Sequence, residues 1–320
     1  MSETNEIDIN SLNQLKRESD RWVVAFLVLI AIVFLGPFLF ILIAIGSRAF
    51  GITRDVGLVS KWLSGSAVLF FLAFLIAFVF FVVVFIMMAK KRSAYRTAYK
   101  TYFSHRVLKS LLENYKYDHA SGISPAELFN TGMVRLGNRF RSEDFVSGRY
   151  KDIGFMQSDL LVEYEYTDSD GDTHTDTYFK GQWLVFEFPR NFAAKLAVVG
   201  RGCREFIYPR KMEKFATEST EFNKMFKVFM QDGVEMFYLL DPKMIEAMQA
   251  LGEKYKGKLS FLFVNHKLHI GLNNGADSFE PPKRLGGEIK EDEEVNRLSE
   301  EFKTVFNLID ALELNKKIFK

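Results

Sequence analysis

Two long apolar runs near the start of the chain dominate its pattern of hydrophobic and polar positions. Residues 22–46 and 62–89 contain no Asp, Glu, Lys or Arg. A helix needs about 20 apolar residues to cross roughly 30 Å of hydrocarbon, so each run can span a bilayer. Buried core helices are the alternative, but these usually keep a polar stripe, and a cleaved signal peptide has only about 7–15 apolar residues. We therefore predict a transmembrane hairpin, with residues 1–21 as a tail and residues 47–61 as the connecting loop.

The charges that flank the two runs predict their orientation. Eight Lys or Arg residues lie just outside the runs, whereas the loop between them carries three. Because cytoplasmic flanks carry the excess of basic residues, both termini are expected in the cytoplasm. Neither run contains an ionisable residue, which transport or proton relay normally requires. The spans are therefore expected to act as anchors or as contacts between protomers.

A basic segment rich in tyrosine follows the second run and opens a predicted helical stalk, residues 90–120. Apolar side chains recur at four-residue spacing along this stalk and form a stripe: Tyr95, Tyr99, Phe103, Val107, Leu111 and Tyr115. The basic residues are candidate contacts to anionic lipid headgroups, although an ordinary cytoplasmic flank has the same composition. They are Lys90, Lys91, Arg92, Arg96 and Lys100.

Residues 121–272 change to a period of two, which is typical of strands with one wet face. Hairpins are predicted around residues 168–172, at Asp232-Gly233 and at Asn265-His266, where the favoured register pairs Phe263 with Leu268 and Phe261 with Ile270. The pattern predicts a cytoplasmic α+β domain built on an antiparallel sheet, which either stays open or closes into a barrel.

Two helix starts interrupt these strands. Ser124 to Glu127 form a capping box with proline at the first helical position. Asp241-Pro242 begins a second helix, whose buried face is expected to carry Met244, Ile245, Met248 and Leu251.

The end of the chain is predicted to be a linker, residues 273–292, followed by an amphipathic helix, residues 293–320. The apolar seam of this helix is too narrow to be stable alone in water. We expect it either to fold back on the stalk or the adjoining sheet, or to dock on another protomer or partner. The candidate docking seam consists of Val295, Leu298, Phe302, Val305, Ile309 and Leu312.

Composition and motifs argue against several kinds of chemistry. Of the 42 Lys/Arg and 40 Asp/Glu residues, 31 and 34 lie in residues 101–320, a balance that disfavours nucleic acid as a partner. The Asp-rich turn at residues 168–172 lacks the later Gly and Glu of an EF-hand. His266 and His269 have no Cys or acidic neighbour in sequence, so we interpret them as surface residues. Arginines around Cys203 favour a thiolate, but Arg210 comes one position late for a phosphatase loop. We assign no catalytic, cofactor-binding or metal-binding residue.

Four segments carry a family resemblance: "SEDFVSGRYKDIGFMQSDLLVEY", "YFKGQWLVFEFPRNF", "ESTEFNKMFKVFMQDGVEMFYLLDPKMIEAMQAL" and "LIDALELNKKIF". They resemble the bacterial family called domain of unknown function 3137, over most of residues 100–320. Asn265-His266 departs from the Asn-Gly turn expected there. The resemblance implies two N-terminal spans joined to a cytoplasmic domain, and hence a multi-pass protein of the bacterial inner membrane. The family has no assigned activity, so no functional residue carries over.

Two functions from different classes follow from these observations. The first is a membrane-anchored, non-catalytic binding or scaffolding module whose partner is the bilayer together with another membrane or cytoplasmic protein, or a second copy. The second is an unrecognised membrane-tethered hydrolase or transferase, with Cys203 as its candidate nucleophile. The missing catalytic motifs favour the first.

Overall fold

The structure is a computed structural model, and it describes most of the chain. The backbone is described for residues 8–49, 56–189, 191–192, 195–203, 212–231 and 240–313. Within these ranges, the side chains of residues 34–49, 56–74, 304, 308 and 311–313 lie outside the description. The chain divides into two compact units: the first comprises Met1–Tyr99 with Pro281–Ile289, and the second comprises Lys100–Glu280 with Lys290–Lys320.

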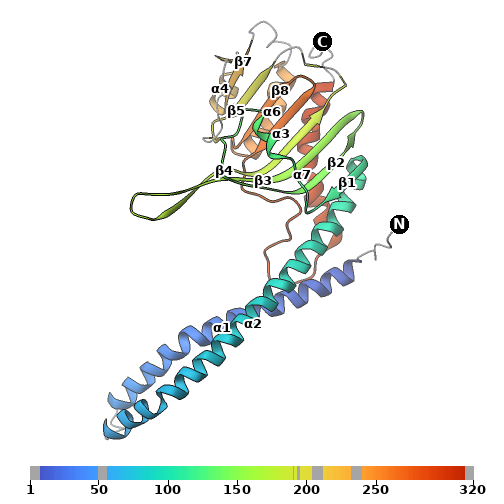
Figure 1. The fold of residues 1–320 in the computed structure, drawn as a ribbon. Coiled ribbons are helices and arrows are strands. Elements are labelled where there is room, and N and C mark those ends of the chain that lie inside the picture. Colours follow the sequence, from blue (N-terminus) through green and yellow to red (C-terminus); the bar gives the residue numbers. More distant parts are fainter. Residues whose placement is uncertain are drawn as a thin grey trace. The chain divides into compact units, whose positions relative to one another are not determined.

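The first unit is built on two long helices, because its sequence has long runs of helix-compatible apolar residues. α1 spans Ile9–Ala49, and α2 begins at Val56 and continues to Leu111, beyond this unit. Within the unit the two helices contact one another (Figure 1), with the ring of Phe26 5.2 Å from that of Phe81. An ion pair of 2.7 Å joins Lys91 on α2 to Glu18 on α1.

Part of the predicted linker packs in the first unit. The backbone N–H of Ile289 donates to Asn13 Oδ1 at 2.8 Å, and Lys16 Nζ donates to the carbonyl of Gly286 at 2.7 Å. Asp20 accepts the N–H of Gly286 at 2.9 Å. Segment 281–289 is therefore attached to the first three turns of α1 by backbone and side-chain hydrogen bonds.

The transmembrane prediction concerns residues that the structure describes only in part. Within the described part of the chain, no helix is both long enough and apolar enough to cross a bilayer. The predicted spans 22–46 and 62–89 both extend into residues 34–74, whose side chains lie outside the description.

The second unit is an α+β fold with a large antiparallel sheet, which confirms the fold class at that level. Among the described residues, nine strands form one sheet in the order β1-β2-β3-β4-β9-β8-β5-β7-β6. Every described pairing is antiparallel, and none joins β1 to β6, so the described sheet is open rather than a barrel. The strands are β1 (Glu113–Asp118), β2 (Arg139–Tyr150), β3 (Ile153–Thr167), β4 (Thr173–Glu187), β5 (Leu196–Gly200), β6 (Glu213–Phe215), β7 (Phe226–Met230), β8 (Leu259–Val264) and β9 (Lys267–Leu272).

Helices cover both faces of this sheet (Figure 1). α3 (Pro125–Phe129) contributes Leu128 to a core with Trp183 and Val185, while the alternate residue Phe186 faces the opposite side. There Phe186 meets Phe306 of α7 (Glu291–Glu313), with ring centroids 6.2 Å apart. α6 (Pro242–Lys254) packs beside α7, and α4 (Thr220–Met225) precedes β7.

Several local predictions are confirmed. β8 and β9 pair in the predicted register, Phe263 with Leu268 and Phe261 with Ile270. Ser124 Oγ accepts the N–H of Glu127 at 3.2 Å, and Asp241 Oδ1 accepts that of Met244 at 2.8 Å, so an N-cap forms at both predicted helix starts. The Glu127 carboxylate, which a capping box would direct back to Ser124, accepts from Lys267 Nζ at 2.8 Å. On α6, Met244, Met248 and Leu251 are buried, whereas Ile245 is half-buried.

Other expectations need correction. The stalk helix ends at Leu111 rather than at residue 120, and Tyr115 belongs to β1, because "ENYKYD" switches to the period of a strand. The hairpin expected at Asp232-Gly233 falls on residues 232–239, which lie outside the described part of the chain. Among the described strands, β7 pairs with β5 and β6.

Candidate functional site

A cluster of buried charged groups lies in the second unit where α2 enters it. Lys100, the first residue of that unit, is only 4% exposed and forms an ion pair with Asp144 on β2. Its ammonium also lies 3.1 Å from Glu280. The hydroxyl of Tyr117 on β1 donates to the other oxygen of Asp144 at 2.6 Å. Two carboxylates and a phenol thus surround one buried cation.

Burial dominates the electrostatics of this cluster. It raises the pKa of Asp144, and the neighbouring Lys100 ammonium only partly offsets the effect. Burial, together with the Asp144 carboxylate, raises the pKa of Tyr117, which therefore stays a neutral donor. Replacing only one partner of such a buried ion pair destabilises the fold, because the charge of the other partner is left uncompensated.

A second buried carboxyl, Asp159 on β3, holds the chain segment that leaves the sheet. Ser278 donates to it twice, through its backbone N–H and through its hydroxyl at 2.7 Å. Gln157 Nε2 donates to the Ser278 hydroxyl at 2.8 Å. Burial raises the pKa of Asp159 well above its ordinary value, while the Ser278 hydrogen bonds act in the opposite direction and the nearby Asp144 charge raises it further.

The residue after Ser278 completes this attachment. Phe279 is 1% exposed and has a φ of 53°, a left-handed conformation that is uncommon for a bulky residue. Its ring lies 5.7 Å from Tyr117 and 5.7 Å from Phe302 of α7. The predicted linker therefore begins with a buried polar and aromatic anchor.

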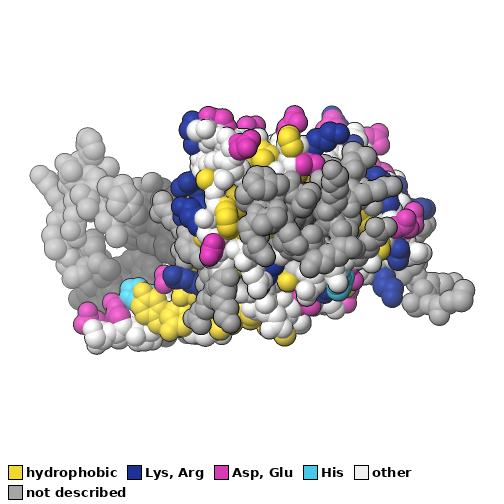
Figure 2. Space-filling view, turned by 90° about the horizontal axis from the view of Figure 1, so that it is seen from above, with side chains coloured by type: hydrophobic (Ala, Val, Ile, Leu, Met, Phe, Trp, Pro, Cys, Tyr) yellow, Lys and Arg dark blue, Asp and Glu magenta, His cyan; other side chains and the backbone are white. Residues whose placement is uncertain are grey.

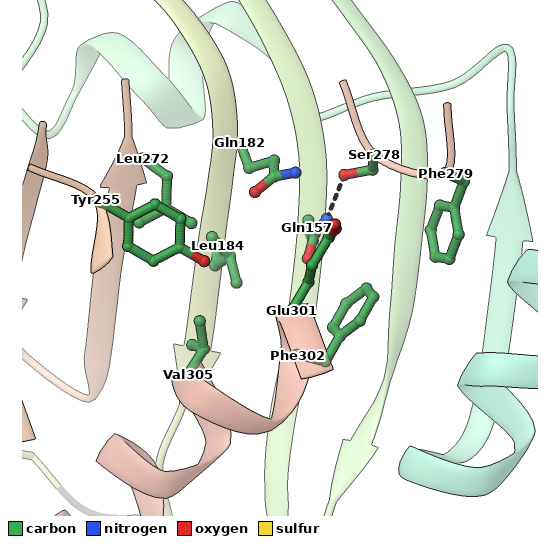
Figure 3. Close-up of a pocket in the computed structure, with 10 residues that line it drawn as sticks. All are labelled: Gln157, Gln182, Leu184, Tyr255, Leu272, Ser278, Phe279, Glu301, Phe302 and Val305. Atoms are coloured by element: carbon green, nitrogen blue, oxygen red, sulfur yellow. Dashed lines mark hydrogen bonds between the residues drawn. The ribbon is translucent and has the colours of Figure 1, made fainter. Parts of the chain in front are cut away.

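A small hollow lies beside this anchor, between the sheet and α7 (Figure 3). Its volume is about 10 Å³, which is room for about one water molecule. Small-molecule sites usually occupy about 300–1,000 Å³, so this hollow is far too small for such a ligand. Burial raises the pKa of Tyr255 to about 12 and also raises that of Glu301. The hollow is lined by Gln157, Gln182, Leu184, Tyr255, Leu272, Ser278, Phe279, Glu301, Phe302 and Val305.

This buried network is suited to stabilising the fold rather than to catalysis. The Ser278 hydroxyl is already engaged as donor and acceptor and is 2% exposed, so it is poorly placed to attack a substrate. The pKa directions reflect burial within a packed network, which structural ion pairs also produce. The network joins α2, β1, β2, β3 and segment 278–280 into one unit.

The structure separates the basic residues predicted as headgroup contacts. Lys90 and Arg92 are exposed on α2, and Lys91 pairs with Glu18. Lys100 does not belong with them. Because its ammonium is buried and paired with Asp144, it is not available to a headgroup, and the candidate set reduces to Lys90, Lys91, Arg92 and Arg96.

The seam predicted for the terminal helix is occupied within the chain. Leu298, Phe302, Val305 and Ile309 are buried and Val295 is half-buried, whereas Leu312 lies outside the described side chains. Phe306, which the seam did not include, stacks on Tyr150 of β2 at 4.2 Å. These contacts leave the described part of the seam covered by the protein's own sheet rather than open to a partner.

Two candidate chemical groups occupy different environments from those predicted. Cys203 is buried, and burial raises the pKa of its thiol to about 12, so the thiolate favoured by neighbouring arginines in sequence does not form readily. His269 is buried rather than on the surface: Trp183 Nε1–H donates to its Nδ1 at 3.4 Å, and burial lowers its pKa to about 4. Among the described residues, no group of His, Cys, Asp or Glu is arranged to hold a metal ion.

Sequence reasoning missed Asp144, Asp159 and Ser278. The signal for Asp159 was present, since Gln157-Ser158-Asp159 interrupts the apolar first part of β3, residues 153–162. A run of polar residues within such a strand must find partners when it is buried. Nothing local indicated that those partners would be Ser278, more than a hundred residues away.

The fold and the buried network define a class of protein: an open antiparallel α+β domain whose first helix continues from a two-helix unit. Residues 177–314 match the family model "Protein of unknown function (DUF3137)". This match confirms the resemblance in the sequence for the part of the chain from Thr177, within β4, through α7. No curated protein matches the chain.

A solved structure also shows a distant similarity. It is the "crystal structure of the mycobacterial trehalose monomycolate transport factor A, TtfA". The match covers 67% of this chain and 93% of that one, at 8% identity and a TM-score of 0.35. A score of this size does not define a common fold.

Proposed function

We propose that the protein is a membrane-anchored, non-catalytic binding or scaffolding module. In this proposal α1 and α2 hold it in the bacterial inner membrane as a multi-pass hairpin with both termini in the cytoplasm. The second unit then presents a cytoplasmic surface to another membrane or cytoplasmic protein, or to a second copy of the chain.

The exposed apolar surface of the first unit carries the anchoring part of the proposal. Large apolar side chains of α1 and α2 are exposed, up to 70% at Ile76. Contiguous apolar surface of this kind is rare on water-soluble proteins and marks contact with a membrane or another protein. The uncharged runs continue on both helices through residues 34–46 and 62–74. The exposed residues are Val24, Leu27, Val28, Ile32, Leu75, Ile76, Phe78, Val79, Phe80, Val82, Val83, Phe85 and Ile86.

The second unit supports the binding part. Its buried polar groups join elements to one another, as the contacts of Lys100, Asp159 and Ser278 illustrate. The competing hydrolase or transferase was predicted with Cys203 as its candidate nucleophile. The most reactive side-chain type available, the thiol of Cys203, is buried with a raised pKa. We therefore favour a rigid module whose function is recognition.

The anchoring proposal is tested by membrane extraction and by thiol accessibility. Because the native thiol of Cys203 would complicate labelling, both variants carry Cys203→Ala. Ser47→Cys tests the loop between the runs, and Ser169→Cys tests an exposed turn in the second unit. In intact bacterial cells, an impermeant maleimide should label position 47 only, and position 169 should react only after lysis.

Each outcome of this experiment is informative. Recovery of the protein in the soluble fraction after alkaline carbonate treatment would overturn membrane anchoring. Labelling of position 169 but not of position 47 in intact cells would keep the anchor and reverse the orientation.

A further inference from the structure

The longest hairpin of the sheet extends beyond its neighbours and carries an exposed aromatic face. β2 accompanies β3 only as far as Glu163, and β9 begins to pair with β4 only at Gln182. Residues 163–177, which we call the arm, continue past both as two paired strands and a turn (Figure 1). A two-stranded hairpin without further cover is marginally stable alone, so its side chains must stabilise it.

Stacked rings provide that stabilisation on one face. Tyr164 and Tyr166 follow the buried Val162 at two-residue spacing, so the core-facing side of β3 continues onto the arm. A β-bulge leaves Tyr178 without a direct partner in the register and turns its ring onto Tyr164, at 6.0 Å and an interplanar angle of 5°. Tyr166 stacks on His174 at 5.4 Å. The result is a column of four rings.

This column is accessible to a partner. Tyr164 and Tyr166 are each 40% exposed. Figure 2 shows hydrophobic side chains and a histidine together, beside acidic side chains, on a projecting part of the described surface at the lower left. The turn beside the column is well ordered by hydrogen bonds, because Asp168 Oδ1 accepts the N–H groups of Asp170 and Asp172 at 3.0 Å each.

The charge of the arm limits the chemistry of its partner. Residues 163–177 contain six Asp or Glu and no Lys or Arg. Asp176 lies directly opposite Tyr164 in the register and so shares its face. Anionic lipid and nucleic acid are therefore disfavoured, whereas a cationic segment would be attracted both by the carboxylates and by the negative faces of the rings.

The protein already shows which cation suits this column. At its base the guanidinium of Arg135 lies over the ring of Tyr178, 5.7 Å from the centroid. On the opposite face of the arm, Arg139 pairs with Glu165 at 2.8 Å. Both of these contacts are made by arginines, which combine a planar face for stacking with a fork of donors for carboxylates.

The edges of the arm favour recognition by side chains over addition of a strand. The side-chain amide of Asn138 bonds both the N–H and the carbonyl of Glu165, at 2.8 Å and 2.6 Å, and so occupies the edge of β3 where β2 ends. Blocking an edge in this way protects a sheet from pairing with another chain.

We propose that the arm is a docking surface for an arginine-rich segment of a partner protein. The arginines stack along the column formed by Tyr178, Tyr164, Tyr166 and His174 and pair with the surrounding carboxylates. The proposal deepens the binding role proposed above, but it does not depend on membrane anchoring. Peptide binding in detergent tests the arm alone, whereas extraction and labelling test the anchor, so the two failures are distinguishable.

The test measures binding of a fluorescent octapeptide of alternating Thr and Arg to the full chain in uncharged detergent. Matched peptides replace Arg with Lys, which keeps the charge, or with citrulline, which keeps the shape without the charge. The arm variant is Tyr164→Thr with Tyr166→Thr, because Thr keeps strand propensity. The control is Thr167→Ser with Thr175→Ser, which alters the opposite face of the same hairpin.

The Arg peptide should bind more tightly than the Lys peptide, and the citrulline peptide should not bind. The tyrosine variant should lose about tenfold in affinity for the Arg peptide, as expected for two exposed cation–π contacts. Asp176→Asn should also weaken binding and reduce its salt dependence, and it leaves the ring column in place if the tyrosine variant proves unstable. Equal binding of the Arg and Lys peptides, with no effect of the tyrosine substitutions, would reduce the arm to a non-specific acidic surface and overturn the proposal. Absence of Arg-peptide binding at low salt, or concentration-dependent self-association through the arm, would overturn it as well.

Discussion

Lys100→Met should destabilise the second unit far more than a change of one side chain on a helix surface. The ammonium of Lys100 is 6% exposed and the carboxylate of Asp144 is 1% exposed, so the pair is almost entirely removed from water. Removing one member of such a pair costs about 3–5 kcal/mol, because the other remains as an uncompensated buried charge. This is a large fraction of the roughly 5–15 kcal/mol that stabilises a typical domain.

The loss should depend on pH in a defined direction. Lys100 lowers the pKa of Asp144 against the opposing effect of burial, so its removal should raise that pKa further. A carboxyl whose folded-state pKa is raised binds protons more tightly when folded. Stability is then retained at low pH and lost as pH rises through the folded pKa. The penalty of Lys100→Met should therefore be smaller at pH 5 than at pH 8.

Urea unfolding followed by tryptophan emission measures this prediction. Trp183 is buried in the core of the second unit, and Trp22→Phe with Trp62→Phe makes it the single reporter. Lys109→Met on the exposed face of the same helix is the matched control and should change stability by less than about 0.5 kcal/mol.

A second substitution separates charge from packing. Asp144 has a φ of 57°, which Asn tolerates, and an Asn oxygen can still accept from Tyr117. Adding Asp144→Asn to Lys100→Met should therefore restore at least about 1 kcal/mol. A loss that is the same at pH 5 and pH 8, and that this second change does not reduce, would refute the electrostatic reasoning and assign the effect to packing.

Four further predictions test other parts of the structure. Gly181→Ala should prevent stable folding, because φ is 148° and the new Cβ would lie 2.0 Å from the carbonyl oxygen of Leu272. Gly171→Ala is the control: its φ is also positive but the space around it is open, so thermal unfolding should show a loss of only about 1 kcal/mol in the free energy of unfolding. Asp159→Asn should flatten the pH dependence of stability, since the raised pKa of Asp159 predicts stability lost as pH rises, by at most about 1.4 kcal/mol per pH unit. Phe306→Ala should cost about 3–5 kcal/mol in urea unfolding through the lost contacts to the sheet. The thiol of Cys203 should react with a disulfide reagent only as fast as the protein unfolds; rapid reaction of the folded protein would revive the nucleophile hypothesis.

The sequence predicted those features that depend on neighbours in the chain. The register of β8 and β9 follows from alternation on either side of Asn265-His266, and the cap at Asp241 follows from the proline beside it. Such signals involve residues a few positions apart, whose conformational preferences do not depend on the rest of the fold.

Features that depend on distant segments were not predictable in this way. The pairing of β4 with β9 and of β5 with β8 sets which strands are central, and no local pattern encodes either. His269 illustrates the consequence: it faces outward in an isolated hairpin, but β4 places Trp183 against it and buries it. The Lys100–Asp144 pair likewise requires α2 and β2 to meet. A charge within a helical stalk gives no sign of that contact.

The assignment of segment 281–289 to the first unit has a consequence for how the protein can be divided. The polypeptide passes between the units at three places, after residues 99, 280 and 289, so neither unit is a continuous stretch of sequence. A fragment that starts at residue 100 would keep these nine residues, among them Gly286 and Ile289, whose hydrogen-bonding partners Lys16 and Asn13 on α1 had been removed. Recombination at a single boundary cannot transfer the sheet domain to a different anchor without leaving this stretch unsatisfied. The two units are therefore expected to have been inherited together, and truncation series should be designed with residues 281–289 excised or with α1 retained.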